Sequence, residues 1–222
     1  RDYLAYEIAD RLTAAGFDEA RLAFQNDSGF HTLASYLAYA TVIRTPADGE
    51  AWLARLAALP AWYDENIKNL RRGVETGWTQ PKIVVDRVLE VAEGQAAAPI
   101  DTDVLLAPFA TAPATIDPAT IAEMRTRAIA LIRDQIRPRQ EQFVAFLKDE
   151  YLPKARASLA VIDMPGGEDW YEYQARHHTT TALTPDEIHD IGLAEVARIR
   201  GLMDGVMAET GFTGTFAEFL AF

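Results

Sequence analysis

The sequence contains no cysteine, which excludes disulfide bonds, thiolate catalysis and cysteine-based zinc sites. It also has no apolar run near the roughly 20 residues that a bilayer-spanning helix needs. Basic residues are outnumbered, with 21 Lys and Arg against 33 Asp and Glu, so the formal net charge is -12. Such a surface repels phosphate backbones and anionic lipid. We therefore expect no nucleic-acid partner and no transmembrane segment.

Residues that carry chemistry are also scarce. The four histidines are His31, His177, His178 and His189. None belongs to the H-E-x-x-H motif of helical zinc peptidases, in which two imidazoles lie one turn apart. The adjacent pair at 177 and 178 diverges by roughly 100° around a helix, so both cannot readily bind one metal. No serine lies in a G-x-S-x-G elbow. The sequence therefore predicts neither a catalytic residue nor a metal ligand set in this chain.

Apolar residues, by contrast, make up 49% of the chain and recur at helical spacing along almost all of it. This pattern predicts an all-α fold, a multi-helix bundle or array. The expected helices, with approximate bounds, are 2–15 (ended by Gly16), 29–43, 45–59, one begun by Pro60 and ended by Gly73 or Gly77, 80–93 (ended by Gly94), 118–150, 169–180, 184–210 and one that begins at Thr215.

Two of these helices carry an apolar stripe, and we expect the stripe of the 184–210 helix to be buried. The stripe of the first helix consists of Tyr3, Leu4, Tyr6, Ile8 and Leu12. The stripe of the 184–210 helix consists of Ile188, Ile191, Val196, Ile199, Leu202, Met203 and Val206. Amphipathic helices of this kind normally turn such a face toward a core.

Residues 94–117 interrupt the helical pattern, because Ala, Pro, Asp and Thr dominate there. A loop of this length is uncommon in a compact domain and is often a lid, a strap or a linker. We therefore divide the chain into a helical part at 1–93, a Pro/Ala-rich loop at 94–117 and a helical part at 118–222. Pro138 lies inside the long helix of the last part and is expected to kink or split it.

The ends of the sequence indicate a piece of a longer protein. It begins at Arg1 without an initiator Met, and it stops at Phe222 inside a helix that has just begun. We expect the missing C-terminal part of the same protein to be a partner of this chain.

The stretch 163–190 is the richest in functional residue types, with three histidines, three aromatic residues and seven acids. Trp170, Tyr173 and His177 are expected to share one face of a short helix, with Tyr171 and His178 on a neighbouring face. Two interpretations stay open. The cluster is either a packed face with internally hydrogen-bonded histidines or a cleft wall that contacts a polar ligand.

Five arginines follow one another at short intervals between 125 and 139, with only one acid among them. We interpret them as a solvated, salt-bridged helix face. They are Arg125, Arg127, Arg133, Arg137 and Arg139.

Several segments of the sequence are familiar when they are taken together. They are L-P-A-W-Y-D-E-N-I-K-N-L-R-R-G-V-E-T-G-W-T-Q-P at 59–81, E-Y-L-P-K-A-R at 150–156, M-P-G-G-E-D-W-Y at 164–171, L-T-P-D-E-I-H-D-I-G-L-A-E-V-A-R-I at 183–199 and G-F-T-G at 211–214. In this order they resemble a bacterial family of unknown function, domain-of-unknown-function family 885.

The resemblance implies a larger helical protein, similar to the helical zinc carboxypeptidases and oligopeptidases. The H-E-x-x-H-type motif of such a protein would lie C-terminal to this segment. The chain would then be an inactive fragment of a zinc-dependent peptidase, forming a wall of the cleft for a peptide or small-molecule substrate. Zinc is expected in the intact protein only. Many such proteins are exported or lipid-anchored, which makes a periplasmic location one option.

Four residues in or beside the matched segments are candidates for substrate binding: Arg156, Tyr171, His178 and His189. His189 has an alternative role, which is to tie two helices together. The alternative function of the whole chain is a non-catalytic helical binding or interaction module that uses the aromatic and histidine cluster or the arginine stretch. The sequence leaves open which of the two applies, and so whether the protein is an enzyme.

Overall fold

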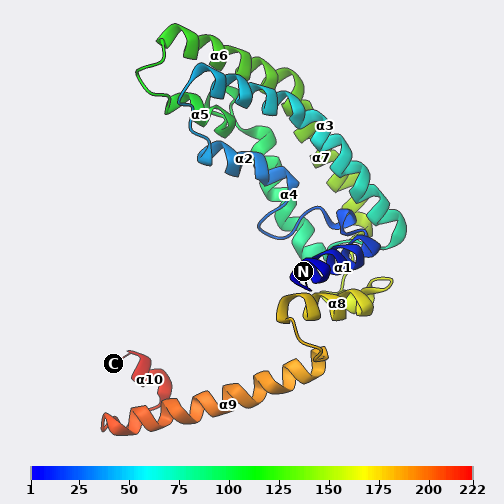
Figure 1. Cartoon of the computed structure of the whole chain (residues 1–222), viewed down its shortest axis with the longest axis vertical. Coiled ribbons are helices and arrows are strands. Elements are labelled where there is room, and N and C mark those ends of the chain that lie inside the picture. The colour runs from blue at the N-terminus through cyan, green and yellow to red at the C-terminus, as the bar shows by residue number, and fades with distance from the viewer. Residues whose placement is uncertain (1, 222) are drawn as a thin grey trace. The chain divides into compact units, whose positions relative to one another are not determined.

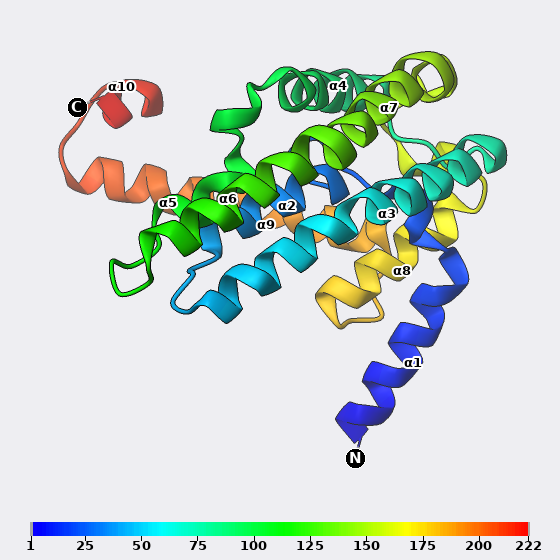
Figure 2. The same ribbon diagram turned by 90° about the horizontal axis from the view of Figure 1, so that it is seen from above.

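The computed structural model describes residues 2–221, and within that range every regular element is a helix or a helical turn. The predicted all-α class is therefore confirmed. The chain divides into two compact units, the first ending at Pro165 and the second beginning at Gly166. Figures 1 and 2 show the helices of both units. Across residues 2–221, no helix is both long and apolar enough to cross a membrane.

The first unit contains most of the helices. In chain order its elements are α1 (Asp2–Phe17), η1 (Glu19–Leu22), α2 (Phe30–Ala40), α3 (Pro46–Thr76), α4 (Lys82–Ala97), η2 (Ile100–Thr102), η3 (Val104–Leu106), α5 (Ala107–Ala110), α6 (Pro118–Leu131), η4 (Ile132–Ile136), α7 (Arg137–Phe146), η5 (Leu147–Tyr151), η6 (Leu152–Lys154) and η7 (Val161–Asp163). Helix α3 packs along α6 and α7, and α4 packs along α7. Figure 2 shows α3 and the α6–α7 run side by side.

Helix α3 is one continuous helix, so the prediction that Pro60 begins a new helix is wrong. Its start is as expected, because the Thr45 hydroxyl accepts a hydrogen bond from the Asp48 N–H and the Asp48 carboxylate accepts one from the Thr45 N–H. Buried apolar side chains precede and follow Pro60 on the same helix, including Leu56 and Tyr63. Their packing on one continuous face outweighs the hydrogen bond that the proline removes.

Two other helix bounds also differ from the prediction. Gly16 and Gly94 do not end their helices, since α1 continues to Phe17 and α4 continues to Ala97. The chain leaves α1 at Asp18 instead, where φ is 52°. A glycine inside a helix costs only about 1 kcal/mol relative to alanine, which is too little to stop a helix.

The long helix after Pro118 does not break at Pro138. The turn η4, two residues before that proline, is a wider π-helical turn in which the Arg137 N–H donates to the Ile132 carbonyl, five residues back. The turn η5 stands in the same relation to Pro153, with the Leu152 N–H donating to the Leu147 carbonyl. A wide turn of this kind leaves space for the proline ring and tolerates the absence of its N–H donor. The helix is therefore locally widened and continues as α7.

Two groups of buried side chains form the core of the first unit. The first lies among α2, α3, η3, α5 and α6 and consists of Ala38, Ile43, Trp52, Leu53, Leu56, Leu105, Leu106, Phe109, Ile116, Met124, Ala128, Ile132 and Ile136. The second consists of Phe24, Phe30, Tyr63, Ile67, Leu70, Val85, Val88, Ala92, Phe143, Phe146, Leu147 and Tyr151. Four of these residues belong to the segment 94–117, so that segment is packed, with short helical turns, inside the first unit.

A buried ion pair holds this segment in place. Arg137, only 8% exposed, donates through Nη2 to the Asp103 carboxylate at 3.1 Å. Its Nη1 donates to the carbonyls of Gln95 and Ala96, in the last turn of α4. Asp103 also accepts a hydrogen bond from the Leu105 N–H at 3.0 Å. The pair therefore connects the long helix, the end of α4 and the start of η3.

The second unit contains α8 (Gly167–Thr179), α9 (Pro185–Glu209) and α10 (Phe216–Ala221). The predicted capping box at the start of α9 is confirmed, because the Glu187 carboxylate accepts from the Thr184 N–H at 2.8 Å and the Glu187 N–H donates to the Thr184 hydroxyl. The predicted helix start at Thr215 is confirmed in the same way by Glu218.

The stripe of the 184–210 helix is not buried, contrary to the prediction, and the apolar side of α1 is exposed as well. Six residues of the α9 stripe, from Ile191 to Val206, are between 42% and 68% exposed. The five apolar residues of the α1 stripe are between 47% and 75% exposed. Each helix has a face suited to packing, but among the described residues no element of the same unit covers either face.

The Arg137→Ala substitution should lower the free energy of unfolding by about 3–5 kcal/mol, because it leaves the Asp103 carboxylate buried without its counter-charge. Urea titration followed by circular dichroism measures the change. Arg127→Ala is the matched control, since that arginine pairs with Glu50 on the surface and its loss should matter far less. Equal destabilisation by the two substitutions would contradict this account.

Candidate functional site

Arg156, the first predicted substrate-binding residue, lies in the first unit. Its carbonyl accepts a hydrogen bond from the Lys82 N–H at 2.8 Å, which holds the chain beside the start of α4. Its guanidinium donates through Nη1 to the Ala160 carbonyl at 3.1 Å. Burial lowers the pKa of Arg156, against the opposing influence of Tyr151 and Asp163. The Nε group is buried and has no hydrogen-bond partner within residues 2–221, so this arginine keeps a free donor.

The other three predicted residues lie in the second unit. Tyr171 and His178 are on α8 and His189 is on α9, and all three are exposed. The ring centroids of Tyr173 and His177 are 5.8 Å apart, as expected for residues on one face of a helix. The rings of His177 and His178 are 4.9 Å apart. The exposed side chains of Tyr171, His178 and His189 are therefore accessible on α8 and α9. A role of these three residues and of Arg156 in substrate binding stays a prediction.

The arginine stretch is mostly the salt-bridged face that was expected. Arg127 pairs with Glu50 at 2.6 Å, Arg133 with Asp134 at 2.7 Å and Arg139 with Asp64 at 3.0 Å. Two arginines differ: Arg125 donates through Nη2 to the Asp101 carbonyl at 2.7 Å, and Arg137 is buried in the ion pair described above. The charge of these residues is largely matched by neighbouring acids, which leaves little of it for an anionic partner.

The first unit encloses a cavity of about 410 Å³ between α2, α3, α4 and the turns that follow α4. Its buried polar side chains are His31, Tyr63, Asp103 and Gln140. Exposed residues at Gly94 and Thr102 mark its mouth. Apolar side chains complete the lining, among them Leu59, Val91, Leu105 and Ile136. We call this space the first-unit cavity.

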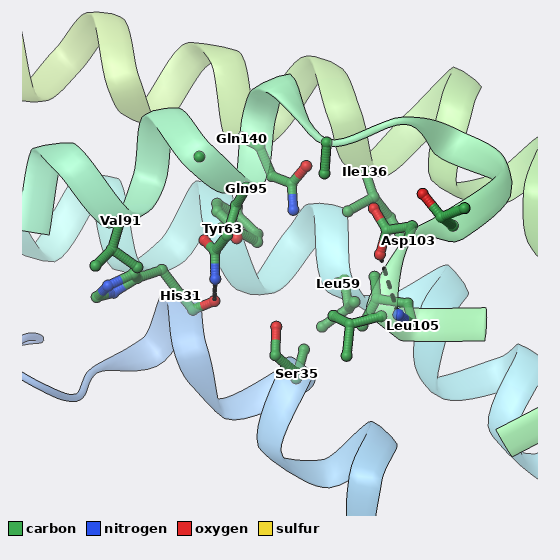
Figure 3. A pocket seen from close by; sticks show the side chains of 15 residues that line it. His31, Ser35, Leu59, Tyr63, Val91, Gln95, Asp103, Leu105, Ile136 and Gln140 are labelled. Atoms are coloured by element: carbon green, nitrogen blue, oxygen red, sulfur yellow. Dashed lines mark hydrogen bonds between the residues drawn. The ribbon is translucent and has the colours of Figure 1, made fainter. Parts of the chain in front are cut away.

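Each polar group of the cavity comes from a different element. His31 follows the first residue of α2, Tyr63 lies in the middle of α3, and Gln140 lies on the first turn of α7, directly after the wide turn η4. Asp103 lies between η2 and η3. Gln95 donates from its amide to the His31 carbonyl at 3.1 Å and so ties α4 to α2. Figure 3 shows these side chains around one enclosed space.

The cavity is close to electrically neutral at neutral pH. Burial lowers the pKa of His31 to about 4, so its imidazole is uncharged. Burial also raises the pKa of Tyr63 to about 12, although the neighbouring Gln140 opposes that rise, so the phenol keeps its proton. The carboxylate of Asp103 is matched by Arg137. A ligand in this space would therefore meet hydrogen-bonding groups without a net charge.

Two buried polar atoms of the cavity are left over after the hydrogen bonds are assigned. The Nδ1 atom of His31 and the Oε1 atom of Gln140 have no hydrogen-bond partner among the residues that the structure describes. These side chains are 3% and 7% exposed. A buried polar atom without a partner costs roughly 1–3 kcal/mol, so each such atom needs an explanation.

The sequence analysis did not find this cavity. It considered His31 only as a candidate metal ligand, and it did not consider Tyr63, Asp103 or Gln140. These residues are spread over more than a hundred positions without a motif. One signal was present in the sequence, since Asp103 directly precedes the apolar run Val104–Leu106, where a lone acid requires a partner if it is buried.

The buried His31 should make stability depend on pH. Its pKa is lower in the folded chain than in the unfolded chain, so the unfolded chain binds more protons between pH 6.5 and pH 4. The stabilisation is complete above about pH 6.5 and is lost as the pH falls toward 4. Between pH 7 and pH 4.5 the loss from this residue should be about 2–3 kcal/mol.

Urea titrations at both pH values, on the original chain and on His31→Gln, measure this effect. The variant cannot gain the proton, so its stability should fall less over the same interval. An unchanged pH dependence in the variant would show that His31 is not the group responsible.

Comparison with known protein families gives a match over the whole chain. The model of one family, described as "Bacterial protein of unknown function (DUF885)", matches residues 1–222. A search of curated proteins gave no match. Among solved structures, the chain is similar to "the putative lipoprotein from Colwellia psychrerythraea", with a TM-score of 0.78, 19% identity and 86% of this chain covered. The chain spans about a third (33%) of that protein's chain. The chain therefore belongs to the bacterial family of unknown function DUF885.

Proposed function

We propose that this chain is the helical part of a larger zinc-dependent peptidase-like hydrolase, in which it forms a wall of the substrate cleft. The observation that carries this proposal is the exposed apolar stripe of α9. Its side chains, between 42% and 68% exposed from Ile191 to Val206, lie on a helix with a complete capping box at its start. Contiguous apolar surface of this kind usually marks a place where another polypeptide or a ligand packs.

Two further observations support the proposal that this chain is part of a larger protein. The segments that resemble the DUF885 family run through most of the chain, from 59–81 to 211–214, and that resemblance implies a larger protein similar to the helical zinc peptidases. The similar solved structure is about three times as long as the part of it that this chain covers. The remaining part of a longer protein would supply both a cover for the α9 stripe and the catalytic groups.

The residues that the structure describes do not fit a zinc site. Within residues 2–221, no group of three or more His, Cys, Asp or Glu side chains is placed so that it could hold a metal ion. In the proposed hydrolase, the zinc ligands would therefore come from another part of the protein. The contribution of this chain would be to bind and orient the substrate and to exclude water from one side of it.

Arg156, Tyr171, His178 and His189 are the groups that we propose for substrate contact. The guanidinium of Arg156, a half-buried residue, suits a carboxylate or carbonyl oxygen of a peptide. Tyr171 and His178 lie on an exposed helix face with room for a ligand. The similar Colwellia protein is described as a "putative lipoprotein", which supports the further proposal that the intact protein is exported.

The full-length protein and the present chain should differ in zinc content and in activity. We expect the full-length protein to bind about one zinc ion and to hydrolyse a quenched fluorescent peptide library, with loss of hydrolysis in 1,10-phenanthroline. The present chain alone should do neither. Elemental analysis and the fluorescence assay measure both properties. Hydrolysis by the present chain alone, or a metal-free and inactive full-length protein, would overturn the proposal.

In the full-length protein, Tyr171→Phe and His189→Gln should each lower kcat/KM by about tenfold, the value of one lost hydrogen bond to the substrate of roughly 1.4 kcal/mol. Arg198→Gln is the matched control, because Arg198 lies on the same helix as His189 and pairs with Glu195 on the surface. Unchanged kcat/KM in both site variants would remove these residues from the cleft.

A further inference from the structure

We propose that the first-unit cavity binds a small uncharged molecule with several hydroxyl groups, of the sugar or polyol class. This inference does not rest on the proposed hydrolase function. It rests on the shape of the cavity, on its neutral charge and on polar atoms in its lining that have no partner.

The polar atoms point to a ligand because they are buried and belong to side chains that line the cavity. Figure 3 shows the side chains of Gln140, Ser35, Tyr63 and Gln95 around this space. The Oε1 atom of Gln140 has no hydrogen-bond partner within residues 2–221, although the side chain is only 7% exposed. A bound molecule that donates a hydrogen bond would remove that cost.

The balance of donors and acceptors favours a ligand rich in donors. Each carboxylate oxygen of Asp103 accepts one hydrogen bond, from Leu105 and from Arg137, while a carboxylate can accept about four. The Oε1 atom of Gln140 is also an acceptor, and the hydroxyl of Ser35 can accept as well as donate. A compound with several hydroxyl groups presents several donors close together, whereas a peptide offers one N–H per residue.

The charge of the cavity excludes an ionic ligand on energetic grounds. A bound cation or anion would lose its hydration without a counter-charge, since Asp103 is already paired with Arg137 and His31 is neutral. The volume of about 410 Å³ accommodates a compact ring compound. Leu59, Leu105 and Ile136 supply the apolar wall against which the C–H face of a ring can pack.

A substitution at the mouth of the cavity tests the proposal without changing the polar side chains of the lining. Gly94 lies in α4 at the mouth, and a Cβ atom added to it would meet no other atom within 4 Å. The Gly94→Phe substitution should therefore fold normally and obstruct entry. Gly201 in α9 has the same open surroundings and lies outside the cavity, so Gly201→Phe is the matched control.

Isothermal titration calorimetry of the whole chain with myo-inositol and with D-glucose tests the proposal. At least one of these probes should bind, and Gly94→Phe should weaken binding tenfold or more while Gly201→Phe leaves it unchanged. Gln140→Leu should weaken it by a similar factor because the acceptor is lost. Circular dichroism of each variant shows whether it is folded, and the Gly94→Phe result stands if Gln140→Leu does not fold.

Four outcomes would overturn the proposal. The first is that neither myo-inositol nor D-glucose binds. The second is that binding is the same in Gly94→Phe as in the original chain, which would place it elsewhere. The third is that sodium acetate or methylammonium chloride binds as tightly as the neutral probes, which would contradict the charge argument. The fourth is that a capped neutral peptide, N-acetyl-trialanine amide, binds more tightly than both polyols.

Discussion

The buried guanidinium of Arg137 joins three parts of the first unit by polar contacts, in addition to the apolar packing between them. It contacts the last carbonyls of α4, the carboxylate of Asp103 and, through that carboxylate, the start of η3. The carbonyl end of a helix carries partial negative charge, so a cation is favourable there. A buried pair recovers the desolvation of its charges only when the geometry is good. Its main contribution is therefore to fix the position of the segment at 100–106 against the long helix.

The same contact borders the cavity. Arg137 and Gln140 follow the wide turn η4 on the long helix, and the ion pair holds Asp103. The polar space that they border lies beside an aromatic cluster around Phe143. Polar atoms inside a core usually persist for function, because an apolar replacement would be at least as stable.

The second unit is stabilised by different interactions from those of the first unit. Its helices are stabilised at their ends by local caps, at Thr184 and Thr215, while the apolar stripe of α9 stays exposed. Local caps can be formed within a few residues, but burial of a stripe requires a partner surface. The chain spans about a third of a similar solved chain, and in the proposed larger protein the remaining part would supply that surface.

The sequence by itself determined the helical class, most helix starts, the capping boxes and the mainly salt-bridged arginine face, because each depends on residues a few positions apart. It did not determine the continuity of α3 across Pro60 or of the long helix across Pro138, since packing and a widened turn decide those. It also did not reveal the exposure of the α1 and α9 stripes or the first-unit cavity. Those features depend on which distant residues meet, and only the tertiary structure brings His31, Tyr63, Asp103 and Gln140 around one space.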